Sequence, residues 1–217
     1  MTRRTKIIAS IGPASDDPRV LKGLIQSGMD IARINLSHES LDLALERYHR
    51  IRAVAAEVGK PVGILADLPG PKVRLGKLPG DGVLLLDGQE FLVTPGTDAS
   101  TAEVFQVDYE DLLTDVHEGD QLVFGDGAVQ VQSLGRQGDH LRVRVNHGGH
   151  LTGRPGIHIP SDRLRIATPT PEDLRFLDAF VEVGVDMIAL SFVRSAHDVR
   201  RVGTEPAPRG PMVVAKI

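Results

Sequence analysis

The chain has 217 residues, of which 41% are hydrophobic and 25% are charged, and its formal net charge is −4. This length and composition predict a globular protein with one large domain or two small ones. The slight acidic excess argues against a nucleic-acid-binding protein, which would carry a basic surface. The absence of cysteine excludes a scaffold held together by disulfides.

The N-terminus and the apolar runs bear on cellular location. Residues 1–6 are basic, but only three apolar residues follow them, too few for the apolar core of a signal peptide. No apolar run approaches the roughly 20 residues that a membrane-spanning helix needs. We therefore expect a cytoplasmic protein that has no membrane partner.

Strand and helix patterns alternate in the first 70 residues. Strands are expected at 6–11, 31–36 and 62–66, and helices from Pro18 to the stop at Gly28 and from Ser40 to the stop at Gly59. The helix starts carry capping residues and the helix ends carry glycine, as is typical of these positions. Because strands recur about every 30 residues with helices between them, the pattern predicts parallel strands joined by crossover helices.

The segment 75–160 has a different texture. It holds 14 of the 23 glycines, and its apolar residues alternate in short runs separated by turns, which is typical of an all-β domain. The strand–helix pattern returns with a capping box at Thr170–Asp173, a strand at 187–192 and a strand at 212–217. We therefore predict an α/β fold in which 1–74 and 161–217 contribute five strands to a βα barrel. A small all-β domain, 75–160, is inserted after the third strand.

The most informative motif is Arg33-Ile34-Asn35-Leu36-Ser37-His38. In a strand, Ile34 and Leu36 point to one face, and Arg33, Asn35 and Ser37 point to the other. A cation, an amide and a hydroxyl in one row do not suit a core. They suit the binding of an anionic ligand at the end of a strand.

Three more strand ends carry polar groups, namely Asp67, Ser191 with nearby Arg194, and Lys216. Each has an ordinary explanation by itself, as a turn, a tolerated serine or a strand leaving the core. In βα barrels, however, the C-terminal strand ends converge on the active site. Together these residues indicate a site with two cations and an acid that could hold a phosphoryl group.

The loop 68–74 contains two prolines around a glycine and is therefore stiff. It places Lys72 and Arg74 close in sequence to the strand end at Asp67. Two interpretations stay open from the residues alone. The loop either contributes these cations to the site or is a rigid hinge into the β domain with charges that face solvent.

These motifs resemble those of pyruvate kinase. The matching segments follow the family's order along the whole chain: 5–15, 32–38, 66–76, 184–194 and 213–217. The resemblance implies a (β/α)8 (TIM) barrel with a β domain inserted after its third strand, so that this chain forms a partial barrel comprising its first five strands. It also implies phosphoryl transfer from phosphoenolpyruvate to ADP, giving pyruvate and ATP, with Mg²⁺ as the cofactor.

The resemblance also implies roles for individual residues. Arg33 resembles the phosphate-binding arginine, and Lys216 resembles the lysine that stabilises the transferring phosphoryl group and the enolate oxygen; these are the expected catalytic residues. Asn35, Ser37 and Asp67 resemble the ligands of a monovalent cation, and Asn35 is also expected to lie at the substrate or nucleotide.

On the nucleotide side, His38 and Arg74 resemble nucleotide-binding residues, and Asp126 resembles the lid aspartate of the β domain. One departure is Arg154-Pro155, where the family usually has a lysine that touches nucleotide. Proline cannot serve in that role. This departure is consistent with a divergent paralogue with altered nucleotide handling.

A second departure concerns the monovalent cation. Potassium-dependent members have threonine after the strand-three aspartate and glutamate in the following loop, whereas this chain has Leu68 and Lys72. This pair resembles the potassium-independent branch, in which the lysine ammonium stands in for the ion. We therefore expect that K⁺ is not required. Pro69 also replaces a more usual polar residue.

The chain ends at Ile217, one residue after Lys216, whereas the family's Mg²⁺-binding glutamate and aspartate would follow. We expect a truncated N-terminal half of a pyruvate kinase that is homo-oligomeric, a tetramer, when complete. One alternative is a non-catalytic chain that binds nucleotide, phosphate or a partner subunit. Another is a phosphoenolpyruvate-using lyase or aldolase, against which the inserted β domain argues.

Overall fold

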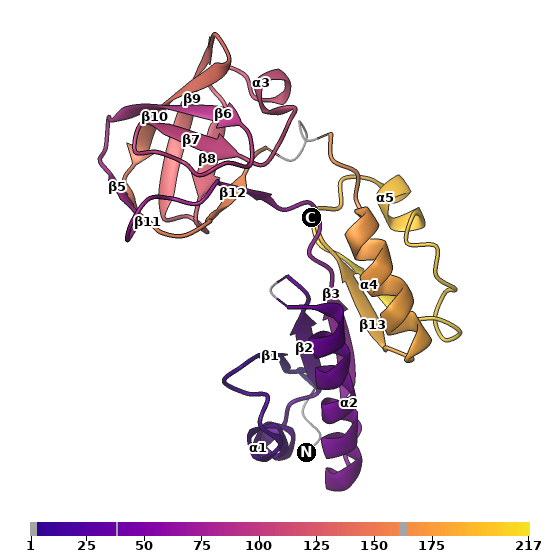
Figure 1. The fold of residues 1–217 in the computed structure, drawn as a ribbon. Helices are drawn as coiled ribbons and strands as arrows, with labels where there is room; N and C mark the ends of the chain where they lie inside the picture. The colour runs from indigo at the N-terminus through magenta and orange to yellow at the C-terminus, as the bar shows by residue number, and fades with distance from the viewer. Residues whose placement is uncertain (1–3, 38, 161–164) are drawn as a thin grey trace. The chain divides into compact units, whose positions relative to one another are not determined.

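The computed structural model describes residues 4–37, 39–160 and 165–217 (Figure 1). The chain forms two compact units. The first comprises Met1–Pro71 and Ala167–Ile217, and the second comprises Lys72–Ile166. The insertion expected from composition is therefore present, but its ends lie slightly outside 75–160. Val73–Arg74 forms strand β4, which pairs with a strand of the second unit, and this pairing assigns these residues to that unit.

The first unit contains a five-stranded sheet in the order β1-β2-β3-β13-β14, and every pair in it is parallel. The strands are β1 Ile8–Ile11, β2 Ile31–Asn35, β3 Gly63–Asp67, β13 Met187–Leu190 and β14 Met212–Ala215. The helices are α1 Pro18–Ser27, α2 Leu41–Val58, α4 Pro171–Glu182 and the short α5 Ala196–Arg200. All five expected strands are confirmed, whereas α5 was not expected from the sequence.

The helix ends show why the sequence forms helices at these positions. The Ser40 side chain accepts a hydrogen bond from the Leu43 amide at the start of α2, and Gly59 ends that helix with a φ of 70°. A left-handed φ of this kind strains any residue that has a Cβ, so glycine suits it. At α4, Thr170 and Asp173 form the predicted capping box.

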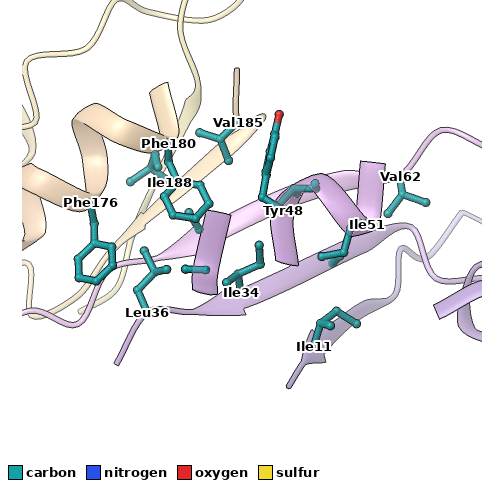
Figure 2. Close-up of a cluster of buried hydrophobic side chains, with 14 of the residues drawn as sticks. Ile11, Ile34, Leu36, Tyr48, Ile51, Val62, Phe176, Phe180, Val185 and Ile188 are labelled. Atoms are coloured by element: carbon teal, nitrogen blue, oxygen red, sulfur yellow. The ribbon is translucent and has the colours of Figure 1, made fainter. Parts of the chain in front are cut away.

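The core of the first unit lies between the sheet and its helices. Figure 2 shows Ile34 of β2 and Leu36, just after that strand, in one buried cluster with Tyr48 of α2 and Phe180 of α4. The rings of Tyr48 and Phe180 meet edge to face with their centroids 6.0 Å apart. The alternation read from the sequence is thus confirmed, because Ile34 and Leu36 are buried while Arg33 and Asn35 on the opposite face are partly exposed.

The second unit is built mainly of strands, with its own buried core. Its seven-stranded sheet has the order β4-β12-β8-β9-β10-β6-β7, and β11 pairs with β5 in a separate ribbon. The elements other than β4 are β5 Val83–Leu85, β6 Glu90–Pro95, β7 Val104–Val107, α3 Leu112–Asp115, β8 Gln121–Phe124, β9 Val129–Gln137, β10 His140–His147, β11 Gly149–Leu151 and β12 Gly156–His158. Among the described residues of this unit, the helix α3 alone departs from the all-β expectation.

Candidate active site

The candidate site is centred on Asp67, the last residue of β3, which is only 2% exposed. Its Oδ2 accepts a hydrogen bond from Nε of Arg33 at 2.7 Å, and Nη2 of Arg33 lies 2.6 Å from the same oxygen. Its Oδ1 accepts a hydrogen bond from Nζ of Lys216 at 2.7 Å. One buried carboxylate therefore holds both cations that the sequence analysis expected to be catalytic.

Strand register explains why these side chains meet. Asn35 of β2 is opposite Asp67 of β3, so Arg33, two residues before Asn35, projects from the same face of the sheet. The C-terminal ends of neighbouring parallel strands lie at the same end of the sheet, so side chains at those ends are brought together. Lys216 directly follows β14, which pairs with β13, and its amide donates to the carbonyl of Leu190.

Arg33 has a second partner that sequence reasoning missed. Its Nη1 donates to Oγ of Ser10 at 2.7 Å, and Ser10 is opposite Arg33 in the register of β1 with β2. The signal that could have found it is the lone hydroxyl at the end of the apolar run 7–9, on the strand next to Arg33. Guanidinium groups fixed on two sides lose less freedom when they bind an anion.

Lys216 is likewise held from two sides. Its Nζ donates to Oγ of Ser191 at 3.0 Å in addition to Asp67, and the Ser191 hydroxyl donates to the carbonyl of Leu68 at 2.7 Å. Ser191 therefore orients the lysine as well as ending its strand. Arg194, expected nearby, donates its backbone amide to Asp198 at the start of α5.

The residues expected to bind a monovalent cation are only partly brought together. Asn35 and Ser37 are adjacent at the end of β2, where the Ser37 amide donates to Oδ1 of Asn35 at 3.2 Å. Asp67 lies opposite Asn35, but both of its oxygens accept from Arg33 and Lys216. Lys72 belongs to the second unit.

Two of the residues expected to bind nucleotide, Arg74 and Asp126, belong to the second unit. Arg74 donates from Nη1 to the carbonyl of Arg154 at 3.2 Å, and Nε of Arg154 donates to the carbonyl of Leu75. Asp126 is exposed in the turn between β8 and β9, with a φ of 56°. His38 lies outside the described residues.

Positive charge dominates the side chains at the strand ends, where Arg33 and Lys216 meet Asp67. Within residues 4–37, 39–160 and 165–217, no group of three or more His, Cys, Asp or Glu side chains is placed to hold a metal ion. The carboxylate at the strand ends, Asp67, already accepts from two cations. The site as described therefore offers positive charge to an anion.

The fold and the site together define a class of protein. A parallel βα sheet with two cations and an acid at its C-terminal strand ends, interrupted by a β unit, is typical of a βα-barrel enzyme that binds an anionic substrate. The chain belongs to the pyruvate kinase family, because the family model described as "Pyruvate kinase, barrel domain" matches residues 2–217. The five-stranded sheet is accordingly part of a pyruvate kinase barrel.

Curated relatives named pyruvate kinase support the same assignment. The chain is 37% identical over 218 residues to that of Thermococcus litoralis, covering 100% of this chain and 46% of the relative. It is 37% identical over 198 residues to that of Agrobacterium vitis, covering 91% of this chain and 42% of the relative. It is 35% identical over 202 residues to that of Mycobacterium tuberculosis, covering 93% and 43%.

The chain thus spans less than half the length of these relatives. The expectation of an N-terminal portion of a pyruvate kinase is consistent with these matches, and none of them favours the non-catalytic alternative. Among the helices of the described residues, none combines the length and the apolar character needed to cross a membrane.

Proposed function

We propose that the protein transfers a phosphoryl group from phosphoenolpyruvate to ADP, giving pyruvate and ATP, and that this chain supplies the phosphoenolpyruvate side of the site. The observation that carries the proposal is the convergence of Arg33 and Lys216 on the buried carboxylate of Asp67. Phosphoryl transfer needs positioning and charge stabilisation more than covalent chemistry from the protein.

The two cations keep donors for a substrate. Arginine has five N–H donors and lysine has three. Arg33 donates from Nε to Asp67 and from Nη1 to Ser10, with Nη2 in close contact with Asp67, and Lys216 donates to Asp67 and Ser191. At least two N–H groups of Arg33 and one of Lys216 therefore remain for phosphoryl or enolate oxygens.

The solvent exposure of the three side chains is consistent with cations that bind a ligand and a carboxylate that positions them. The side chains of Arg33 and Lys216 are 30% and 44% exposed, whereas that of Asp67 is 3% exposed. A ligand can therefore reach the cations but not the carboxylate between them. We propose that Arg33 binds the phosphate and that Lys216 stabilises the charge that develops on the transferring phosphoryl group and the enolate oxygen.

Substitution of Lys216 tests the proposed function. For Lys216→Met we expect kcat for pyruvate formation to fall about 100-fold or more, because a charge that stabilises the transition state is lost. Phosphoenolpyruvate binding should persist through Arg33, which keeps its own contacts. The matched control is Lys22→Met, because Lys22 forms a solvent-exposed ion pair with Glu57, and its kcat should stay within about twofold. Unchanged turnover in Lys216→Met would reject the assigned role.

We also propose that activity does not require K⁺. The support is the residue pair Leu68 and Lys72, an apolar and a basic residue at the two sequence positions where potassium-dependent members have polar and acidic ones. Turnover measured in potassium buffer and in sodium-only buffer of equal ionic strength should agree within about twofold, since a fixed charge does not depend on the ion supplied. A large stimulation by potassium would contradict this proposal.

A further inference from the structure

The chain passes twice between the two units, after Pro71 and after Ile166, and one buried carboxylate contacts the chain beside both passages. Asp173, the third residue of α4, is fully buried. Its Oδ1 accepts a hydrogen bond from the amide of Gly70 at 2.9 Å, and its Oδ2 accepts one from the amide of Thr170 at 2.8 Å. Gly70 lies just before the first passage and Thr170 just after the second.

The contact at Gly70 is reinforced by packing. Gly70 has a φ of 69°, and a Cβ built on it would lie 2.7 Å from Cδ2 of Phe192. The backbone at Gly70 thus packs directly on the ring, and no larger residue would be accommodated without displacement. Pro69 and Pro71 flank this glycine and restrict the chain further. The loop that precedes the first passage is therefore firmly fixed to the first unit.

The second passage is bounded on both sides. Before it, the amide of Arg165 donates to the Tyr109 hydroxyl at 3.2 Å, and Nε of Arg165 lies 2.9 Å from Oδ1 of Asp115. Burial, together with the hydrogen bond to Asp115, raises the pKa of Tyr109 to about 12, so its hydroxyl stays protonated. After it, Nη1 of Arg201 donates to the carbonyl of Thr168 at 3.2 Å. The unit-to-unit connection is thus confined to a few residues.

Helix α5 shows what an ordinary capping aspartate does in this chain. Asp198 occupies the same position in a capping box with Ser195, and its Oδ2 accepts from the adjacent amides of Arg194 and Ser195. Both contacts are local. Asp173 makes the same cap but adds the amide of Gly70, 103 residues away in the sequence. Helix capping alone does not require this second contact.

From these contacts we propose that Asp173 is a positioning residue that anchors both passages of the chain to the first unit, and thereby limits how the β unit moves relative to the barrel. A carboxylate suits this role because each of its oxygens accepts and neither donates. An asparagine would present an NH₂ group to one of the two amides. The anchoring holds whatever reaction the protein catalyses, and only its effect on turnover rests on the proposed phosphoryl transfer.

The test compares Asp173→Asn with the matched control Asp198→Asn. Because this chain contains no cysteine, Ser27→Cys in the first unit and Asp139→Cys in the second give two exposed labelling sites with no competing thiol in residues 1–217. We expect the distribution of label-to-label distances, measured by single-molecule energy transfer, to broaden in Asp173→Asn and to stay as in the parent protein in Asp198→Asn. The Gly70 amide should exchange with deuterium about 10-fold faster in Asp173→Asn alone.

An unchanged distance distribution in a folded Asp173→Asn variant would overturn the proposal, and so would equal broadening in Asp198→Asn. If Asp173→Asn does not fold, hydrogen exchange in the unsubstituted protein tests the proposal instead. There the amides of Gly70 and Thr170 should be protected to a similar degree, and a Gly70 amide that exchanges as fast as an unstructured one would refute the bridge. In the active protein, Asp173→Asn should lower kcat more than it changes KM for phosphoenolpyruvate, because Arg33 and Lys216 keep their contacts.

Discussion

At the scale of single residues, Asp67 organises the candidate site. Removing its negative charge would leave Arg33 and Lys216 without the carboxylate that compensates their positive charges, although each cation retains a serine partner. By its position in the sequence, Asp67 resembles a ligand of a monovalent cation, and that role remains a prediction. What the structure adds is a role in which the carboxylate holds Arg33 and Lys216.

We expect Asp67→Asn to lower the free energy of unfolding of the first unit by about 2 kcal/mol, because the hydrogen bonds from Arg33 and Lys216 lose their charged acceptor. The partial exposure of both cations keeps the cost at the lower end of the usual range. Urea denaturation measures it. Asp139→Asn is the control, since its ion pair with Arg136 is almost fully exposed and should contribute less than about 0.5 kcal/mol. Equal effects of the two substitutions would contradict this account.

At the scale of elements, helix α2 contacts the N-terminal ends of strands β3 and β13, which lie opposite the strand ends of the candidate site. The Tyr48 hydroxyl donates to the carbonyl of Val183 at 2.7 Å. Arg52 donates to the carbonyls of Val62 and Gly184 and to Oδ2 of Asp186, just before β3 and β13 begin. Polar contacts at the N-terminal strand ends of a barrel are typically structural, whereas those at the C-terminal ends serve chemistry. These contacts therefore stabilise the sheet that positions the site.

The prediction for this element is that Arg52→Lys costs about 1–3 kcal/mol of stability, because lysine keeps the charge but cannot reproduce the forked hydrogen bonds. Arg50→Lys on the same helix is the matched control. Arg50 makes one ion pair, with Asp16, at 2.6 Å, and a lysine ammonium can replace that contact. Thermal unfolding of both variants measures the loss of stability in each. A loss in Arg50→Lys as large as that in Arg52→Lys would be evidence against a stabilising role for the forked hydrogen bonds of Arg52.

At the scale of the whole molecule, two separate hydrophobic cores divide the chain. Phe180 is fully buried in the core of the first unit, and Phe124 is fully buried in that of the second. The buried residues of the two cores do not overlap among the described residues. A substitution in one core is therefore expected to lower the stability of its own unit more than that of the other.

We expect Phe124→Ala to destabilise the second unit and Phe180→Ala the first, each by about 3–5 kcal/mol. Hydrogen exchange of strand amides, followed at increasing urea concentrations, reports on each unit through its own strands, β9 or β2. Each substitution serves as the control for the other. If either one shifted the unfolding of both sets of amides equally, the two units would be a single cooperative structure instead.

Much of the fold was predictable because its signals are local. Capping residues, stop glycines and the alternation around Arg33 depend on neighbours within a turn or a strand, and the structure confirms them. The short helix α5 was missed because it spans only five residues, too few to show a periodic pattern. The ends of the β unit were misplaced by a few residues, since the pairing of β4 with β12 joins segments far apart in the sequence.

By itself, the sequence determined the order of strands and helices, the inserted β unit, the polar strand ends and the resemblance to pyruvate kinase. Only the tertiary structure decided that Asp67 binds both Arg33 and Lys216, 34 and 149 residues away from it, and that Asp173 reaches Gly70 across 103 residues. The physical reason is that such contacts depend on the register of strands and on packing between distant segments, which no local pattern of residues encodes.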